Sequence, residues 1–296
     1  MVGGTDVKKR LNGSKIFDII NAIILGLLGI VCLYPLVYVF ACSVSNGQAV
    51  DAGKVLLLPK GFNLESYKQV LSDKLFWSSY GNTLYFTILG SLFSMVVSTP
   101  AAYALSKKRF GSRKFINIVL SFTMWFTPGF IPLYLNYTSL GAKNNRFMIL
   151  ISFGIQAFYI ILLRNYFEAV PTELEESSMI DGANDFICFI KIYLPLSKPA
   201  LATVWLYYAM SRWNGYFWST ILIKDMHKIP LQVYLKQKII DQALVSEYAS
   251  SIAGQQYSYN TIIYALVFCS IVPVLIVFPY IQKFFVKGVM VGGVKG

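Results

Sequence analysis

The carboxylates of this chain are concentrated in one segment. Six of its 14 acidic residues fall between Glu168 and Asp185, in a sequence that is otherwise apolar and basic. A group of carboxylates and small polar residues of this kind offers hydrogen-bond acceptors and negative charge to a neighbour. Two interpretations follow from the residues alone. The segment is either an ordinary solvated loop with some helix, or a docking site for a partner with a basic groove.

The segment carries the signals of a short helix that ends at a glycine corner. Thr172 and Glu175 have the spacing of a capping box, in which each side chain bonds the backbone of the other. Glu173 adds a carboxylate to the first turn, where it favours the helix dipole. Gly182 suits the left-handed backbone conformation that ends many helices. We therefore predict an acidic helix that begins at Thr172 and ends just before Gly182.

A second helix is predicted directly after this corner. Asn184 can cap its first turn, and Pro195 and Pro199 close it before the next apolar run. Its apolar residues recur at spacings of 0, 3, 4 and 7, which predicts one amphipathic face. That face is formed by Phe186, Phe189, Ile190 and Tyr193.

A second group of polar and aromatic residues lies inside an apolar run. Arg212, Trp213 and Asn214 are adjacent, and Tyr208 lies four residues before Arg212. A charge inside a membrane span is costly and is by default a functional hypothesis. Guanidinium, amide and aromatic groups together suit a sugar, and an acidic sugar favours Arg212 further. Trp125, in another run, is a further candidate contact. The alternative is that backbone carbonyls or a partner subunit neutralise Arg212, while the aromatic residues serve packing.

The elements that must position these residues are transmembrane helices. Of the 296 residues, 56% are hydrophobic and only 14% are charged. Apolar runs of this length cross a bilayer as helices, because lipid offers no hydrogen-bond partner to the backbone. We therefore predict an all-α polytopic membrane protein with a single domain over 1–296. The six predicted transmembrane helices are 16–43, 83–106, 115–139, 147–167, 199–223 and 261–285.

Proline and glycine residues predict interruptions in these spans. The third contains Pro128, Gly129 and Pro132, so it should be kinked or broken. Pro35 and Pro100 are expected to interrupt the first and second spans. Broken backbone is tolerated in a membrane only where neighbouring helices or a cavity satisfy the freed carbonyls.

The basic residues predict the orientation. Five cations lie in the eight residues Lys107–Lys114, against two in 140–146, and cations favour the cytoplasmic side of short loops. Both termini and the acidic segment, 168–199, should then be cytoplasmic. The two longer loops, 44–82 and 224–260, should be extracytoplasmic. The net charge of +12 is explained by this bias, and nucleic-acid binding is excluded because no basic face is interleaved with exposed aromatics.

The sequence lacks the residues of an enzyme active site. It has no G-x-x-x-x-G-K-[ST] phosphate loop, and its one histidine, His227, falls in a predicted outer loop. Its four cysteines are not spaced for metal binding or redox chemistry. We therefore expect no enzymatic activity, no metal site and no cofactor in this chain. Any energy source must be supplied by another protein.

The acidic segment resembles a known motif. It matches the EAA loop of ABC importer permeases, in particular the carbohydrate-uptake group that includes the maltose-transporter permease subunits. The chain departs from that motif at Ser177 and Ser178, where the family usually has alanines. The residues that carry the resemblance are Glu176, Asp181, Gly182, Ala183, Pro195 and Pro199.

The resemblance covers nearly the whole chain and implies a type I ABC importer permease in the bacterial inner membrane. Its implied partners are a second homologous permease, two cytoplasmic ATPases that bind ATP and magnesium, an external solute-binding protein and a sugar. The glycine-rich tail, 286–296, is similar to one that contacts the ATPases. Stretches such as Thr123–Phe126 and Pro230–Gln232 look like the oligosaccharide branch. The implied ATPase-coupling residues are Glu175, Glu176, Asp181, Gly182, Ala183, Pro195 and Pro199.

Three alternatives remain. A secondary carrier coupled to ions needs an acidic relay inside the membrane, and the predicted spans contain only Asp18. An ABC permease for a solute other than a sugar would share the same loop. An intramembrane enzyme would need a catalytic constellation within the spans, and the sequence offers none.

Overall fold

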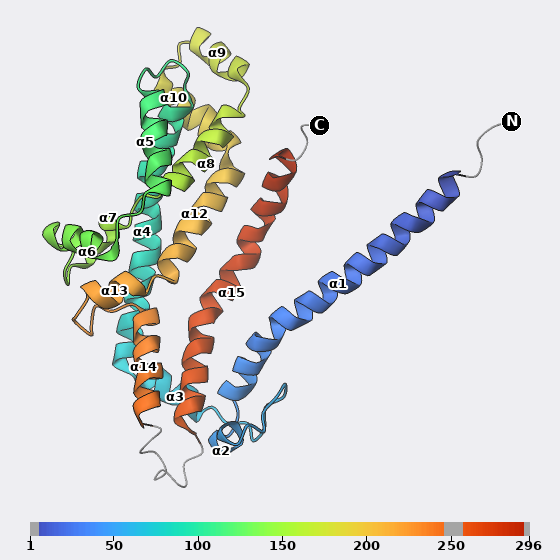
Figure 1. Cartoon of the computed structure of the whole chain (residues 1–296), viewed down its shortest axis with the longest axis vertical. Helices are drawn as coiled ribbons and strands as arrows, with labels where there is room; N and C mark the ends of the chain where they lie inside the picture. The colour runs from blue at the N-terminus through green and yellow to red at the C-terminus, as the bar shows by residue number, and fades with distance from the viewer. Residues whose placement is uncertain (1–5, 246–256, 293–296) are drawn as a thin grey trace. The chain divides into compact units, whose positions relative to one another are not determined.

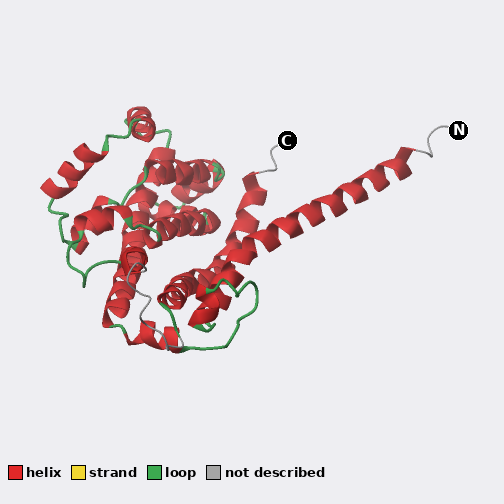
Figure 2. Ribbon diagram, turned by 60° about the horizontal axis from the view of Figure 1, so that its bottom comes forward, coloured by secondary structure: helices red, strands yellow, loops and turns green. Residues whose placement is uncertain are grey.

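The computed structural model describes residues 6–245 and 257–292. Within those ranges the chain forms helices and connecting loops without any strand, which confirms the prediction of an all-α fold (Figures 1 and 2). The chain divides into two compact units. The first unit comprises residues 1–72 and 238–271, and the second comprises residues 73–237 and 272–296.

The first unit is built on the C-terminal end of a long apolar helix. Ala41 and Cys42 of this helix form a buried core with Val50 and Val55, and Tyr264 packs against it. Ser66 and Thr261 are joined across the unit by a buried hydrogen bond of 2.7 Å between their hydroxyls. Its helices are α1 (Asp6–Ser43), α2 (Gly47–Asp51) and α3 (Glu65–Ser72), together with parts of α14 (Leu231–Val245) and α15 (Tyr259–Gly292).

The second unit is organised around one helix, α4, which packs against α8 and α12. Ser91, Ser94 and Ser98 of α4 are fully buried, and small residues of this kind let membrane helices approach closely. The helices of this unit are α4 (Lys74–Ser106), α5 (Arg113–Trp125), α6 (Phe130–Ser139), α7 (Arg146–Ser152), α8 (Ala157–Glu168), α9 (Thr172–Ile180), α10 (Asp185–Cys188), the π-helix η1 (Phe189–Tyr193), α11 (Leu194–Leu196), α12 (Lys198–Trp213) and α13 (Phe217–Leu222), together with the other parts of α14 and α15.

Three continuous helices of the described chain are long and apolar enough to cross a membrane. They are Lys15–Ser43 of α1, the whole of α4, and Tyr259–Tyr280 of α15. Three further candidates are pairs of helices with a sharp bend between them. The pair α5 and α6 bends by 120°, α7 and α8 by 53°, and the helices on either side of Ser197 by 82°. The number of spans is six if each bent pair is one span.

The predicted interruptions were right for the third span and wrong for the first two. Helix α5 ends before Pro128 and α6 begins directly after Gly129, as expected. In contrast, Pro35 lies inside α1 and Pro100 lies inside α4, and both helices continue past them. A proline removes only one helical hydrogen bond, so a long membrane helix can continue where neighbouring groups satisfy the freed carbonyl.

Two predicted spans contain breaks that their composition did not reveal. The run 147–167 is divided between α7 and α8, and the run 199–223 is divided between α12 and α13. Gly154 lies in the first break, where an added Cβ atom would lie 2.5 Å from the Phe93 ring. Gly215 lies in the second break, directly after the C-cap residue Asn214.

Candidate functional site

The acidic segment forms the predicted glycine corner. Helix α9 ends at Ile180, and Gly182 has a φ of +85°, in the left-handed region that favours glycine. The amide of Ala183 donates to the Ser178 carbonyl at 2.9 Å, which closes the corner. Asn184 then caps α10, because its Oδ1 accepts a hydrogen bond of 2.9 Å from the Ile187 amide. Both the glycine corner and the Asn184 cap are therefore confirmed.

The predicted capping box was wrong. Pro171 is the N-cap residue of α9, and no side chain caps this terminus. The Glu175 carboxylate instead turns inward, and its side chain is only 12% exposed. It accepts hydrogen bonds from Lys107 Nζ at 2.6 Å, Tyr193 Oη at 2.6 Å and Arg109 Nη2 at 3.2 Å. Three donors distant in sequence thus outcompete the local backbone amide.

The predicted single amphipathic face after the corner was also wrong. Residues 189–193 form a π-helix between α10 and α11. Cys188 and Tyr193, five positions apart, are buried, whereas Phe186 and Ile190 are exposed. The wider turn changes the register, because a π-helix repeats at i and i+5. Prolines then occupy the first turns of the two following helices, Pro195 in α11 and Pro199 in α12.

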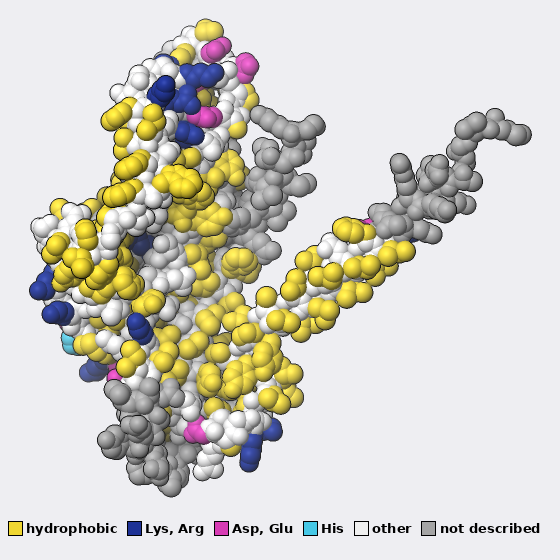
Figure 3. All heavy atoms as spheres, in the orientation of Figure 1, with side chains coloured by type: hydrophobic (Ala, Val, Ile, Leu, Met, Phe, Trp, Pro, Cys, Tyr) yellow, Lys and Arg dark blue, Asp and Glu magenta, His cyan; other side chains and the backbone are white. Residues whose placement is uncertain are grey.

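Ion pairs join the acidic segment to the basic segment after α4. Beyond the Lys107–Glu175 pair, Arg109 contacts Asp185 and Arg113 contacts Glu168. The two segments therefore lie together at the α9 end of the second unit, where acidic and basic side chains gather (Figures 1 and 3). This confirms that the two segments share one side of the protein.

Burial and hydrogen bonding shift the pKa values of this cluster. Burial alone raises the pKa of Glu175, but hydrogen bonds from Lys107 and Tyr193 outweigh it and hold the pKa below its ordinary value. Burial lowers the pKa of Lys107, and the hydrogen bond to Glu175 opposes this change. The carboxylate is therefore stabilised in its charged form.

The outer surface of α9 is both acidic and apolar. Glu173, Glu176 and Asp181 are exposed, as is the glycine corner. Ile180 is 86% exposed and Leu174 is 43% exposed. Exposed apolar side chains next to carboxylates are typical of a surface that binds another protein. Among the proposed coupling residues, Glu176, Asp181 and Gly182 lie on this surface, Ala183 is half-buried, and Glu175 points away from it.

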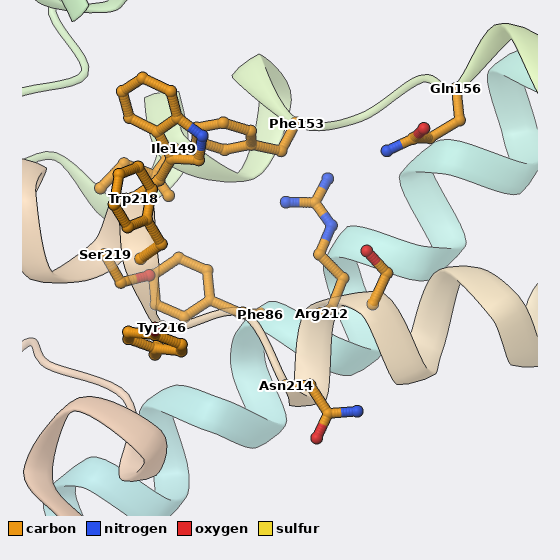
Figure 4. A pocket seen from close by; sticks show the side chains of 12 residues that line it. Phe86, Ile149, Phe153, Gln156, Arg212, Asn214, Tyr216, Trp218 and Ser219 are labelled. Atoms are coloured by element: carbon orange, nitrogen blue, oxygen red, sulfur yellow. The ribbon is translucent and has the colours of Figure 1, made fainter. Parts of the chain in front are cut away.

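A cavity of about 350 Å³ forms where the two unexpected helix breaks meet α4. Its size lies within the range of small-molecule sites. Figure 4 shows the guanidinium of Arg212 pointing into this cavity, with Gln156 on one side and Phe153 and Trp218 on the other. The lining residues are Phe86, Ile149, Phe153, Gln156, Ser211, Arg212, Asn214, Gly215, Tyr216, Phe217, Trp218 and Ser219.

Arg212 is held by the backbone and not by a carboxylate. Its Nη2 donates to the Leu150 carbonyl at 2.9 Å. Gly90 of α4 lies beside it, and an added Cβ atom there would lie 3.1 Å from Arg212 Nε. In the described part of the chain no carboxylate lies within ion-pair distance of this guanidinium. An Arg in this state retains donors for an anionic ligand.

Aromatic rings form the wall opposite Gln156. Trp218 stacks on Phe130 with ring centroids 5.4 Å apart and contacts Phe153 at 5.8 Å. Tyr137 meets the Trp218 ring edge-on at 5.0 Å. These contacts hold Trp218 in place, and flat apolar rings of this kind suit the apolar faces of a sugar ring.

The predicted sugar-contacting residues divide into two groups. Arg212 and Asn214 line the cavity. Tyr208 is 1% exposed and bonds Ser98 Oγ at 2.7 Å behind the cavity wall. Trp213 faces a separate apolar cavity of about 280 Å³, and Trp125 is 89% exposed at the end of α5. The structure therefore does not bring Tyr208, Trp213 or Trp125 into the cavity.

The sequence interpretation missed the four lining residues that come from earlier parts of the chain, Phe86, Ile149, Phe153 and Gln156. Gly154 and the polar Gln156, both inside the apolar run 147–167, were the available signals. A glycine and an amide two residues apart in a predicted span favour a break that lines a cavity.

Known proteins with related sequences and structures are transport permeases. A permease of Bacillus subtilis described as a polygalacturonan/rhamnogalacturonan transport system protein is 35% identical over 96% of this chain and 99% of its own. The maltodextrin transport system permease of the same organism is 28% identical over 92% of this chain and 94% of its own. A chain from the crystal structure of a bacterial ABC transporter that imports the acidic polysaccharide alginate has a TM-score of 0.85 and 48% identity. That match covers 92% of this chain and 98% of the other.

These findings confirm the resemblance drawn from the acidic segment. The family model that matches residues 75–291 describes the inner membrane component of binding-protein-dependent transport systems. Its match includes α4, the acidic segment and the Arg212 cavity. This protein therefore belongs to the family of inner membrane components of binding-protein-dependent transport systems.

Proposed function

We propose that this chain is a permease subunit of an ATP-driven bacterial importer for acidic oligosaccharides. The observation that carries the substrate class is the Arg212 guanidinium, which opens into an aromatic cavity without a carboxylate partner in the described chain. A uronate sugar supplies a carboxylate for that guanidinium and an apolar ring face for Trp218. The similarity to proteins described as permeases for polygalacturonan/rhamnogalacturonan and alginate supports this choice.

The proposed energy input is the exposed surface of α9. Glu176, Asp181 and the neighbouring Ile180 would enter a groove of a separate cytoplasmic ATPase, and Gly182 would keep the corner tight. Ala183, Pro195 and Pro199 would fix the direction of the helices that follow. ATP and magnesium would be bound by two such ATPases, so that this chain conducts the sugar and catalyses no reaction itself.

The proposed topology places 168–199 on the cytoplasmic side and the loops 44–82 and 224–260 outside. The outer loops would face the solute-binding protein, which delivers the sugar. The proposed ATPase-contacting tail, 286–296, continues α15 as far as Gly292, and residues 293–296 lie outside the described residues. A second homologous permease would complete the pathway across the membrane.

Transport by the reconstituted complex tests the substrate class. This chain, its partner permease and two ATPases would be placed in proteoliposomes with the binding protein outside. We expect ATP-dependent uptake of a labelled galacturonate or alginate oligosaccharide and much slower uptake of a neutral maltodextrin of equal length. Equal uptake of both, or faster uptake of the maltodextrin, would contradict the acidic class.

A single substitution at the glycine corner tests the coupling role. Gly182→Arg places a large side chain at a φ of +85°, which only glycine adopts readily. We expect a protein that still inserts into the membrane but neither transports nor stimulates the ATPases. The matched control is Gly141→Arg in the short loop after α6, another glycine with positive φ (+78°) and open space around its α-carbon. Wild-type uptake by Gly182→Arg would refute the coupling role.

A further inference from the structure

The two adjacent carboxylates Glu175 and Glu176 of α9 have different surroundings. Glu176 is exposed on the outer surface of the helix. Glu175 turns the opposite way, and its side chain is 12% exposed. Lys107, the residue that directly follows α4, is 10% exposed in its side chain and bonds Glu175 at 2.6 Å. The two carboxylates are therefore suited to different tasks.

Glu175, Lys107 and Tyr193 form a compact polar joint, which we call the Glu175 joint. The Tyr193 hydroxyl donates to the same carboxylate oxygen as Lys107, at 2.6 Å. The Lys107 ammonium also lies 3.6 Å from the centre of the Tyr193 ring and 4.3 Å from the centre of the Tyr103 ring. A cation between two aromatic faces and bonded to a carboxylate has little freedom to move.

The joint connects three separate elements. Tyr103 lies in the last turn of α4 and Lys107 directly follows that helix. Glu175 belongs to α9, and Tyr193 closes the π-helix. The π-turn buries Tyr193 five residues after the buried Cys188 and lets its hydroxyl reach Glu175. Single π-turns in helical segments often occur at functional positions.

Helix α4 continues from this joint to the Arg212 cavity. It is unbroken from Lys74 to Ser106 and carries Phe86, which lines the cavity, and Gly90, which lies beside Arg212. At 1.5 Å per residue, the distance along the helix from Gly90 to Lys107 is roughly 25 Å. A helix without a break is a rigid element that can carry a displacement from one end to the other.

We infer that Glu175 is a positioning residue that locks α9 to the end of α4, so that a movement of α9 is transmitted through α4 to the Arg212 cavity. This inference rests on the proposed coupling role of α9. Glu176 would bind the ATPase, whereas Glu175 would bind only within its own chain. Loss of Glu175 should then leave ATPase binding and hydrolysis intact while separating them from transport.

The test measures transport per ATP hydrolysed in the complete reconstituted complex. Glu175→Gln keeps the shape of the side chain but removes its charge. We expect about tenfold fewer oligosaccharides imported per ATP, because the acceptor of the Lys107 and Tyr193 hydrogen bonds is no longer charged. ATPase binding and the hydrolysis rate should remain close to wild type. Glu176→Gln should do the opposite and weaken ATPase binding.

Two further variants make the test specific to the joint. Tyr193→Phe removes only the hydroxyl and leaves the ring beside Lys107, so transport per ATP should fall by a smaller factor. The double variant Lys107→Met with Glu175→Gln should be no worse than Glu175→Gln alone, because both remove one interaction. Lys15→Gln, which removes an exposed charge from α1, is the control and should have no effect.

Three results would overturn the inference. The first is an unchanged amount of transport per ATP in Glu175→Gln. The second is a loss of ATPase binding in Glu175→Gln as large as that in Glu176→Gln. The third is a loss of transport per ATP in the double variant that equals the sum of the losses in the two single variants. If the Glu175→Gln protein does not accumulate in the membrane, Tyr193→Phe replaces it in the test. Unchanged transport per ATP in Tyr193→Phe then overturns the inference. Failure of the proposed function is distinguishable, because then Gly182→Arg would also transport normally.

Discussion

Two charged side chains, Arg212 and Glu175, are at least partly buried in this protein. They differ in how many hydrogen-bond partners each has within the chain. Glu175 is saturated, since three donors from distant positions converge on its carboxylate. Arg212 bonds one backbone carbonyl and opens into a cavity. A saturated charge holds structure together, whereas a charge with open donors is available to a ligand.

Arg212→Gln should strongly reduce uptake of an acidic oligosaccharide. The amount of the variant protein in the membrane should change far less. A charge-assisted hydrogen bond to a carboxylate is worth roughly 1.5–3 kcal/mol, so we expect about a 10- to 100-fold loss at limiting substrate. Initial uptake rates over a range of concentrations measure this loss. Lys15→Gln, which removes an exposed cation from α1, is the control.

Acidification should weaken the Glu175 joint. The pKa of Glu175 is held below its ordinary value, so its contribution to stability is complete above the unfolded pKa of about 4.3 and is lost as the pH falls through the lower folded pKa. The thermal stability of the detergent-purified complex should therefore fall as the pH drops below about 4.3. Glu175→Gln should show a smaller fall below that pH, and an identical fall in both proteins would contradict this assignment.

At the scale of elements, the cavity owes its shape to helices that stop. The breaks after α7 and after α12 place Phe153, Gln156 and Asn214 around Arg212. Irregular backbone at such positions needs either protein neighbours or a polar cavity for its amides and carbonyls. The residues at these two breaks therefore form the walls of the proposed sugar site.

Gly154→Ala should destabilise the bend between α7 and α8. Its Cβ atom would lie 2.5 Å from Phe93 Cε1 and 2.9 Å from the Ile151 carbonyl oxygen, so the ring and the bend would have to shift. Overpacking of this kind costs roughly 1–3 kcal/mol. The expected result is a lower melting temperature of the purified complex and reduced uptake.

Gly81→Ala is the matched substitution. Gly81 lies inside α4 with nothing within 4 Å of an added Cβ atom. Alanine is favoured over glycine in a helix by up to roughly 1 kcal/mol, so stability should be unchanged or slightly higher. A melting temperature of Gly154→Ala equal to that of Gly81→Ala would show that the close packing of the bend has no consequence.

At the scale of the whole molecule, the acidic and basic segments share one end of the second unit through their ion pairs. The apolar side chains of α1 from Ile16 to Leu33 are exposed in the isolated chain. Such a surface is stable in lipid or against another membrane chain and not in water. This agrees with a family of inner membrane components that work in assemblies.

The proposed topology predicts which side of the membrane each loop faces. In a variant whose four native cysteines are replaced by serine, Ile180→Cys and Leu58→Cys place thiols at positions 86% and 77% exposed. An impermeant maleimide should label Leu58→Cys in intact cells and Ile180→Cys only after lysis. The reverse pattern would invert the orientation derived from the basic residues.

Local signals in the sequence were sufficient for several features. The all-α class follows from composition, because only helices satisfy their own backbone in lipid. The corner at Gly182 follows from the backbone conformation that glycine allows. The cap at Asn184 follows from a hydrogen bond between its side chain and the amide three residues later. The break near Pro128 follows from the missing amide of proline. Each depends on interactions within a few residues.

Only the tertiary structure decided what the charged residues contact. Lys107 and Glu175 are 68 positions apart, and Arg212 and Leu150 are 62 positions apart. The local pattern predicted that Glu175 forms a capping box. In the structure its carboxylate binds a lysine and a tyrosine, which stabilise a buried carboxylate better than one backbone amide does. The sequence by itself therefore determined the helices and the acidic corner, because those depend on neighbouring residues. The Glu175 joint and the Arg212 cavity depend on which distant helices pack together, and packing decides that.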